Sequence, residues 1–278
     1  SLTRILDAPS AAAQTLRSYK DGGYIWKALR EFRRMVDPRI GIINERLKDI
    51  RNIIAVSSGK GGVGKSLVAS VMALTLARGG YKTGLLDLDF TSPSTHVILG
   101  VKGLYPEEEY GIIPPQVYGL RYMSIVYYSG EHASPLRGAD VSNALIELLT
   151  ITRWGPLDFL VIDMPPGISD ATLDIIRIIK RIRFLIVTTP SRLAFETVRK
   201  LIDLLRGVKV PIIGVIENMK MKKSSFIREE VEKRGIKFLG EIPFDIEVEE
   251  AIGNVNELLG ITFGRRLSDI VAKNLSSS

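Results

Sequence analysis

The chain has 278 residues, of which 45% are hydrophobic and 25% are charged, values that are ordinary for a globular protein. It contains no cysteine, which excludes disulfide bonds and any metal or cluster site built from this chain's own thiolates. No apolar run is long enough to span a membrane and no secretory leader pattern is present, so we expect a cytoplasmic protein.

The net charge of +7 is unevenly distributed along the chain. Residues 1–52 hold 11 Lys and Arg against 6 Asp and Glu, whereas the remainder holds 27 against 25. A basic arm of this kind can contact nucleic acid or an anionic membrane, but more often it is a solvated face. Nucleic acid and membrane therefore stay open as partners without being favoured.

Helical patterns fill the second half of this basic stretch. Four apolar residues at helical spacing predict an amphipathic helix over residues 24–36: Ile25, Leu29, Phe32 and Val36. A second helical piece is predicted over residues 40–49. We divide the chain into a basic helical N-terminal extension, residues 1–51, and one larger domain, residues 52–278. The extension could dock on its own domain or on a partner, and we expect the former.

From residue 53 onward strands and helices alternate, which predicts an α/β fold with a mostly parallel, twisted sheet flanked by helices. Residues 100–119 are irregular and predict an edge hairpin. We expect strands near residues 53–57, 83–88, 121–126, 158–163, 183–188, 210–217 and 237–241, and helices near residues 65–78, 140–151, 170–180, 192–206, 226–234, 246–253 and 264–275.

The first predicted strand leads into the sequence GKGGVGKS, residues 59–66, which fits the phosphate-binding pattern G-x-x-x-x-G-K-[ST]. Strand, glycine loop and helix N-terminus form an anion site, because backbone N–H groups and the helix dipole converge on a phosphate. Lys65 would reach the β- and γ-phosphates, and the Ser66 hydroxyl would bind Mg²⁺. The nucleotide-binding residues predicted here are Gly59, Lys60, Gly61, Gly62, Val63, Gly64, Lys65, Ser66 and Leu67.

Carboxylates follow two later strands. Asp87 and Asp89 stand at the end of the second strand, where loops form a ligand crevice, although they could be ordinary solvated strand-end residues. We assign Asp87 to the surroundings of Mg²⁺ and Asp89 to the attacking water. Asp163 ends another apolar strand and is predicted to hold Mg²⁺, and the Gly167 N–H after it is expected to be free to face a γ-phosphate.

The base of the nucleotide is predicted to lie near two further strand ends. Asn218 carries an amide that can both donate to and accept from a purine, and the stretch around Pro243 can offer backbone contacts. Both also fit ordinary strand-end chemistry. The aspartate of a guanine-reading N/T-K-x-D box is missing after Asn218, which favours ATP over GTP.

Together these motifs resemble the Mrp/ApbC family of iron–sulfur carrier ATPases, within the MinD/ParA superfamily of P-loop proteins. The resemblance implies a deviant Walker A box, in which Lys60 reaches across a homodimer to the partner's nucleotide and acts in catalysis with Asp89. The matching stretches are residues 56–66, Asp87 with Asp89, Pro93-Ser94, Arg137-Gly138, and residues 154–158, 163–167, 188–190, 217–219 and 239–243.

One departure from this family concerns its cargo. Such proteins usually carry a C-x-x-C pair after the strand that ends in Glu-Asn-Met, and here residues 220–225 read KMKKSS. The resemblance therefore implies a Mg²⁺- and ATP-dependent dimeric switch in iron–sulfur or metallocentre assembly, with an unknown client protein and without cluster ligands of its own. Two alternatives stay open: a MinD/ParA-like positioning ATPase acting on membrane or DNA, and a nucleotide-gated adaptor with little hydrolysis.

Overall fold

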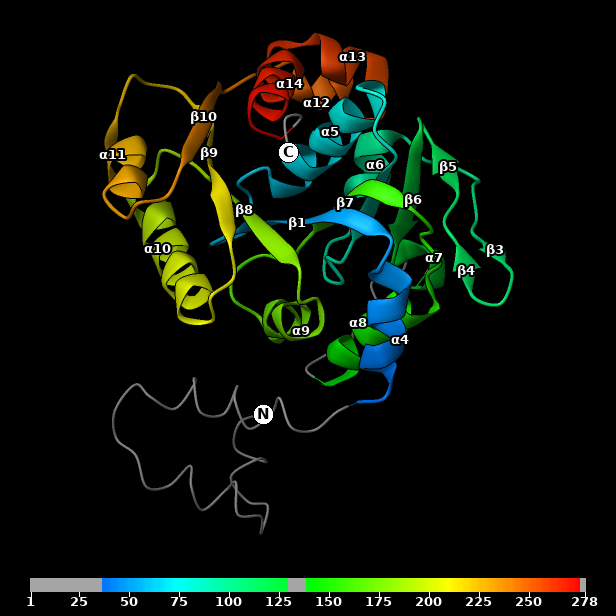
Figure 1. Ribbon diagram of the computed structural model, residues 1–278. Helices are drawn as coiled ribbons and strands as arrows, with labels where there is room; N and C mark the ends of the chain where they lie inside the picture. The colour runs from blue at the N-terminus through cyan, green and yellow to red at the C-terminus, as the bar shows by residue number, and fades with distance from the viewer. Residues whose placement is uncertain (1–36, 130–138, 276–278) are drawn as a thin grey trace, which may run out of the picture.

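A twisted, mostly parallel sheet forms the centre of the protein (Figure 1). The computed structural model describes residues 37–129 and 139–275. Within these ranges eight strands form the main sheet, and only β5 runs antiparallel to its neighbour. In spatial order they are β10 (Phe238–Pro243), β9 (Ile212–Lys220), β8 (Ile182–Thr188), β1 (Ile50–Ser58), β7 (Leu157–Asp163), β2 (Thr83–Asp87), β6 (Leu120–Ser124) and β5 (Gln116–Val117).

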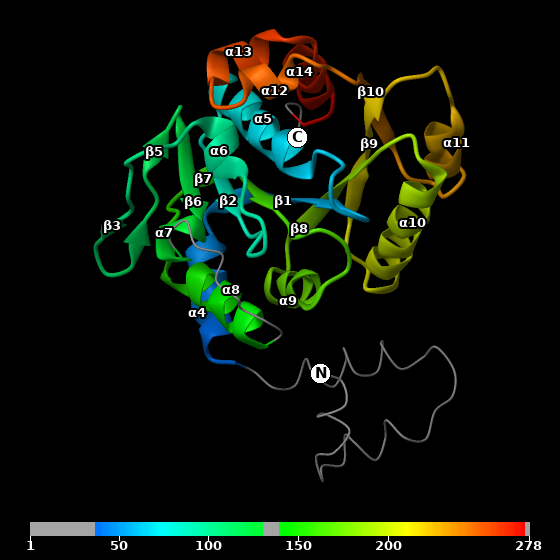
Figure 2. The same cartoon turned by 180° about the vertical axis from the view of Figure 1, so that it is seen from behind.

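The central strands are continuous apolar runs because helices cover both faces of the sheet. In β7, six of the seven residues are buried, and the pattern of β8 is the same. One face carries α5 (Lys65–Arg78), α6 (Thr95–Leu99), α12 (Val248–Ala251), α13 (Val255–Gly260) and α14 (Thr262–Leu275) (Figures 1 and 2). The other carries α4 (Arg39–Leu47), α8 (Ala139–Ile151), α9 (Asp170–Ile178), α10 (Arg192–Gly207) and α11 (Phe226–Glu232).

The predicted α/β architecture is confirmed, and so is the edge hairpin, which pairs β3 (Glu107–Glu108) with β4 (Ile112–Ile113). The predicted strand over residues 121–126 was too long, because β6 ends at Ser124 and the short helix α7 (Val126–Ser129) follows. The predicted helix over residues 246–253 shrinks to α12. We did not predict α6, α7 and α13, which are too short for a helical period to stand out.

The start of the described chain packs onto this domain. Helix α4 corresponds to the helix predicted over residues 40–49, and it contacts α8 and α9. Its residues Ile43 and Leu47 are buried in the core on that face of the sheet. The helix predicted over residues 24–36 lies outside the described residues. None of the helices in residues 37–129 and 139–275 has the length and apolarity needed to cross a bilayer.

Candidate functional site

The glycine loop connects the buried end of β1 to the start of α5, at the carboxyl edge of the sheet. Gly62 and Gly64 have φ angles of 76° and 79°, a left-handed conformation that residues with a Cβ rarely adopt. A Cβ on Gly64 would lie 2.4 Å from Nδ2 of Asn218, so no side chain fits there. Gly59 is equally enclosed, since its Cβ would lie 2.2 Å from Oγ1 of Thr197 on α10. The glycines thus set both the path of the loop and its packing.

Three charged side chains meet beside this loop. The ammonium of Lys65, which is 6% exposed, donates a hydrogen bond to Oδ1 of Asp163 at the end of β7. It also donates to Oγ of Ser66 at 3.2 Å and lies 4.0 Å from Oδ2 of Asp89. The sequence motifs predicted that these four residues share one site, and the structure brings them together. One buried cation therefore faces two carboxylates.

Asp163 retains an oxygen that could bind a cation. Its Oδ2 is buried and has no hydrogen-bond partner among the described residues. Burial raises the pKa of Asp163 to about 7, the Lys65 ammonium opposes this rise, and the nearby Asp87 carboxylate adds to it. Both facts indicate too little positive charge around this carboxyl group.

A magnesium ion would correct that shortage. Mg²⁺ is bound in phosphate sites by one or two protein ligands together with phosphate oxygens and water, so it needs no protein cage. The described residues contain no group of three or more His, Cys, Asp or Glu side chains that could hold a metal. Asp163 and the Ser66 hydroxyl fit Mg²⁺ held in this way.

Asp87 differs from Asp163 in its hydrogen bonds, although the two residues are paired across β2 and β7. Its Oδ1 accepts the N–H of Asp89 at 3.0 Å, and its Oδ2 accepts the N–H and the hydroxyl of Thr95 at 3.2 and 2.6 Å. Burial raises the pKa of Asp87, and these bonds oppose the rise. Both oxygens of Asp87 are thus engaged in holding the turn that follows β2.

Asp89 lies in that turn. Its Oδ1 accepts hydrogen bonds from the N–H and hydroxyl of Thr91 at 3.2 and 2.7 Å and from the N–H of Ser92 at 3.1 Å. Its Oδ2 faces the Lys65 ammonium. The residue is only 6% exposed, and the direction of its side chain is set by the turn itself.

The expectation of a free Gly167 N–H was wrong for this structure. This N–H donates to the carbonyl of Ser58 at 2.9 Å, just as the N–H of Met164 donates to Val56 at 3.1 Å. The segment after β7 therefore continues the pairing with β1 beyond the ends of the regular strands. Gly167 still lies against the loop, since its Cβ would be 3.7 Å from the carbonyl oxygen of Gly59.

Pro243 ends β10, and Asn218 lies just before the end of the neighbouring β9, which runs to Lys220. The Asn218 side chain is directed at the phosphate loop. Its Nδ2 donates to the carbonyl of Val63 at 2.9 Å, and the residue is 2% exposed. Pro243 borders a cavity of about 230 Å³ that is also lined by Lys220, Met221, Lys222, Lys223, Glu241 and Arg266.

Lys60 is the one lysine of the loop that points to solvent. It is exposed, and within residues 37–129 and 139–275 its side chain has no ion pair or hydrogen bond. Its backbone carbonyl accepts the hydroxyl of Ser58 at 2.8 Å, which fixes the backbone from which the side chain projects. Nothing within the described chain therefore neutralises this cation.

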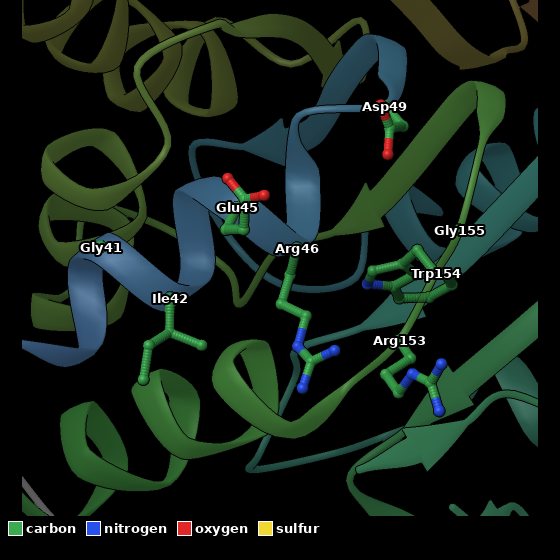
Figure 3. Close-up of a pocket in the computed structure, with 8 residues that line it drawn as sticks. All are labelled: Gly41, Ile42, Glu45, Arg46, Asp49, Arg153, Trp154 and Gly155. Carbon is green, nitrogen blue, oxygen red and sulfur yellow. The ribbon is translucent and has the colours of Figure 1, made fainter. Parts of the chain in front are cut away.

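A larger cavity, of about 610 Å³, lies at the opposite end of the strands, next to the residues that precede β1 and β7 (Figure 3). Its two arginines hold backbone carbonyls: Arg46 donates to Thr150 and Tyr110, and Arg153 donates to Glu109. This cavity is separate from the glycine loop. Its lining consists of Gly41, Ile42, Glu45, Arg46, Asp49, Arg153, Trp154 and Gly155.

Two residues of the site had no sequence signal. Thr95 and Tyr122 are fully buried beside Asp87, but no motif distinguishes a threonine at a helix start or a tyrosine within a strand. The predicted motif residues Arg137 and Gly138 lie outside the described residues.

Known proteins that resemble this chain include iron-transfer P-loop NTPases and iron-sulfur cluster carrier proteins. A family model in the ParA group, described as the NUBPL iron-transfer P-loop NTPase, matches residues 49–273. The chain is 40% identical over 222 residues to an iron-sulfur cluster carrier protein of Aquifex aeolicus, covering 74% of this chain and 61% of that protein. The corresponding protein of Saccharolobus solfataricus is 37% identical over 230 residues, covering 75% of this chain and 76% of the relative.

Solved structures agree with the fold. A nucleotide-binding protein of Archaeoglobus fulgidus, solved in complex with ADP, superimposes with a TM-score of 0.66 at 30% identity, covering 85% of this chain and 93% of that one. The cell-division ATPase MinD of Pyrococcus furiosus has a TM-score of 0.61 at 19% identity, covering 82% and 100%. At that identity the second likeness concerns the fold alone.

Proposed function

Because the chain belongs to the family of NUBPL-type iron-transfer P-loop NTPases, we propose that it is a Mg²⁺-dependent ATPase that works as a nucleotide-gated homodimer. The observation that carries this proposal is the convergence of Lys65, Asp163 and Asp89 at the glycine loop. Phosphoryl transfer depends mostly on positioning and on neutralising charge, and these residues offer both.

Each residue has a defined role in this proposal. The loop amides and Lys65 bind the phosphates, while Ser66 and Asp163 hold Mg²⁺, which would neutralise charge on the phosphate oxygens. Asp87 supports the metal indirectly, because its own oxygens hold the turn after β2. Asp89 orients the attacking water. The base is adenine, since no guanine-reading aspartate follows Asn218.

The exposed Lys60 supports the dimer. An unpartnered cation inside a phosphate loop can stabilise transition-state charge in a second subunit, as a finger residue supplied in trans does. The dimer we propose therefore has two facing loops, with each Lys60 directed at the nucleotide of the other subunit.

The cargo of the switch follows from the family and from composition. Iron–sulfur clusters are held by thiolates, and this sequence has no cysteine. We therefore assign it the nucleotide-driven step of iron–sulfur assembly, with the cluster held by a client protein. The client binds the ATP form and is released after hydrolysis.

A membrane-positioning role is less well supported. The amphipathic helix nearest the described C-terminus is α14. Its residues Phe263, Leu267, Val271 and Leu275 are buried in the core, mostly against α5 and β10. An apolar face that already packs within the domain is not free to enter a bilayer.

The direct test measures ATP binding and hydrolysis by the full chain, with and without Mg²⁺, beside a Lys65→Ala control. We expect Mg²⁺-dependent turnover that the control lacks, and a preference for ATP over GTP. Tight ATP binding with no turnover above the control would favour the nucleotide-gated adaptor instead. To find the client, an Asp89→Ala variant with ATP serves as bait, and an iron–sulfur protein retained only with ATP supports the proposal.

A further inference from the structure

A chain of buried hydroxyl groups ends on Asp87. The hydroxyl of Tyr122, on β6, lies 2.8 Å from that of Thr95, the first residue of α6, and Thr95 Oγ1 lies 2.6 Å from Asp87 Oδ2. All three side chains have an exposed fraction of 0%. Three different elements thus meet at one carboxylate without any contact with water.

The direction of these hydrogen bonds follows from the number of hydroxyl hydrogens available. A hydroxyl group has one hydrogen, and that of Thr95 is donated to the carboxylate of Asp87. The Tyr122 hydroxyl must then be the donor in its contact with Thr95. Burial and the nearby Asp87 charge both raise the pKa of Tyr122, so its phenol keeps the hydrogen that this arrangement needs.

The site gives this chain a specific task. Asp87 and Asp163 face each other across paired strands, and the ammonium of Lys65 is bonded to Asp163. Asp87 is instead stabilised by neutral donors: the N–H of Asp89, and the N–H and hydroxyl of Thr95. Hydrogen bonds to the ionised form favour a buried carboxylate much as a cation does.

Because Asp87 is held in place, it also holds the turn that carries Asp89. Its Oδ1 accepts the N–H of Asp89, and Asp89 in turn organises Thr91 and Ser92. If Asp87 were free to rotate, this turn would lose the bond that fixes its first residue. Outer partners of this kind typically change activity or metal affinity by about 10- to 100-fold when they are removed.

We propose that Thr95 and Tyr122 are positioning residues that hold Asp87, and that Asp87 holds the turn of Asp89 in the geometry needed for hydrolysis. This inference rests on the proposed ATPase function. Tyr122 reaches Asp87 through Thr95, and its hydroxyl also interacts with the side chain of Ser124 at the end of β6. The hydroxyls are therefore coupled in series, which two unrelated buried polar groups would not be.

The test uses Thr95→Val, Thr95→Ser, Tyr122→Phe, the double variant Thr95→Val with Tyr122→Phe, and the control Tyr127→Phe. Tyr127 packs edge-on to Tyr122 at 5.9 Å, and its buried hydroxyl has no partner among the described residues. The control therefore removes a hydroxyl that takes no part in the hydrogen-bonded series from Tyr122 to Asp87. Thermal unfolding of each variant confirms that it is folded before its kinetics are compared.

We expect Thr95→Val to lower kcat by about 10- to 100-fold and to leave KM for ATP within about twofold, because the turn and not the phosphate loop is disturbed. Thr95→Ser should retain most of the activity. Tyr122→Phe should lower kcat less than Thr95→Val, and the double variant should match Thr95→Val alone. A double variant whose loss is the product of the two single losses overturns the proposal, as does full activity of Thr95→Val.

A second readout does not require ATP hydrolysis. In the nucleotide-free protein, amide hydrogen exchange at Asp89 and Thr95 should be faster in Thr95→Val than in wild type and Tyr127→Phe. If wild type lacks turnover, the proposed function fails while exchange still decides whether the hydroxyls fix this turn. Unchanged exchange in Thr95→Val overturns the positioning role even when wild type is an active ATPase.

Discussion

The side-chain amide of Asn218 donates a hydrogen bond of 2.9 Å to the carbonyl of Val63, which ties the end of β9 to the phosphate loop. The same nitrogen fills the space in which a Cβ of Gly64 would stand. The left-handed loop and the strand end therefore fit each other, and a change in either one disturbs the phosphate site.

Asn218→Ala separates two roles of this residue. Leaving a buried carbonyl without its donor costs ~1–3 kcal/mol, so the loop should bind phosphates about tenfold more weakly. If Asn218 acts through the loop, the Kd values for ATP and GTP rise by the same factor, as calorimetry can measure. A rise confined to ATP would instead show that the amide reads the base. Asn254→Ala, which removes the cap of α13, is the matched control.

Lys65→Ala should abolish nucleotide binding and also destabilise the nucleotide-free protein. Asp163 loses the ammonium on which it depends and is expected to take up a proton, at a cost of ~1–3 kcal/mol in the free energy of unfolding. Urea denaturation measures this loss. Adding Asp163→Asn should recover part of it, since the carboxylate that the Lys65 ammonium neutralised is then gone, and failure to recover any would contradict the pairing seen here.

Lys60→Ala should bind ATP normally and lose turnover, because the Lys60 side chain has no contact within the described chain that supports the loop. The loss expected for a finger cation supplied in trans is about 10³- to 10⁵-fold in kcat. Another exposed lysine, Lys102, gives the control Lys102→Ala. Wild-type hydrolysis by Lys60→Ala would rule out the trans-lysine arrangement.

Asp89→Ala should bind ATP but fail to hydrolyse it, and so should accumulate as the ATP-bound dimer. Light scattering after size-exclusion chromatography can measure its mass with ATP and with ADP. We expect a dimer with ATP and a monomer with ADP. A monomer under both conditions would count against a nucleotide-gated dimer, whatever the hydrolysis rate.

Local sequence patterns were sufficient for the parts of the site that lie on strand ends. Three apolar runs predicted β1, β7 and β2, and the register of these strands in the structure brings Asp163 between Val56 and Asp87. The same patterns could not reveal which oxygens stay free. Whether Asp87 or Asp163 is engaged depends on Thr95, whose position is set by the short helix α6 and not by any motif.

The Gly167 amide shows the same limit. We expected this N–H to be free, but it donates to the carbonyl of Ser58 in β1, far away in sequence. Contacts across strands are set by packing, which residue type alone does not encode. The short helices α6, α7 and α13 were not predicted for a related reason, since each is shorter than two helical turns.

Helix α14, the last helix of the described chain, packs against α5, the helix that follows the phosphate loop. Helix α5 is buried on nearly all sides, and α14 closes the side that the sheet leaves uncovered, with Thr75 and Ser268 bonded at 2.9 Å. Leu267→Ala, although far from the loop in sequence, should therefore disturb the nucleotide site through α5. It is expected to cost ~2–5 kcal/mol in the free energy of unfolding. A tag or fusion that strains α14 would then weaken ATP binding without contacting the site itself.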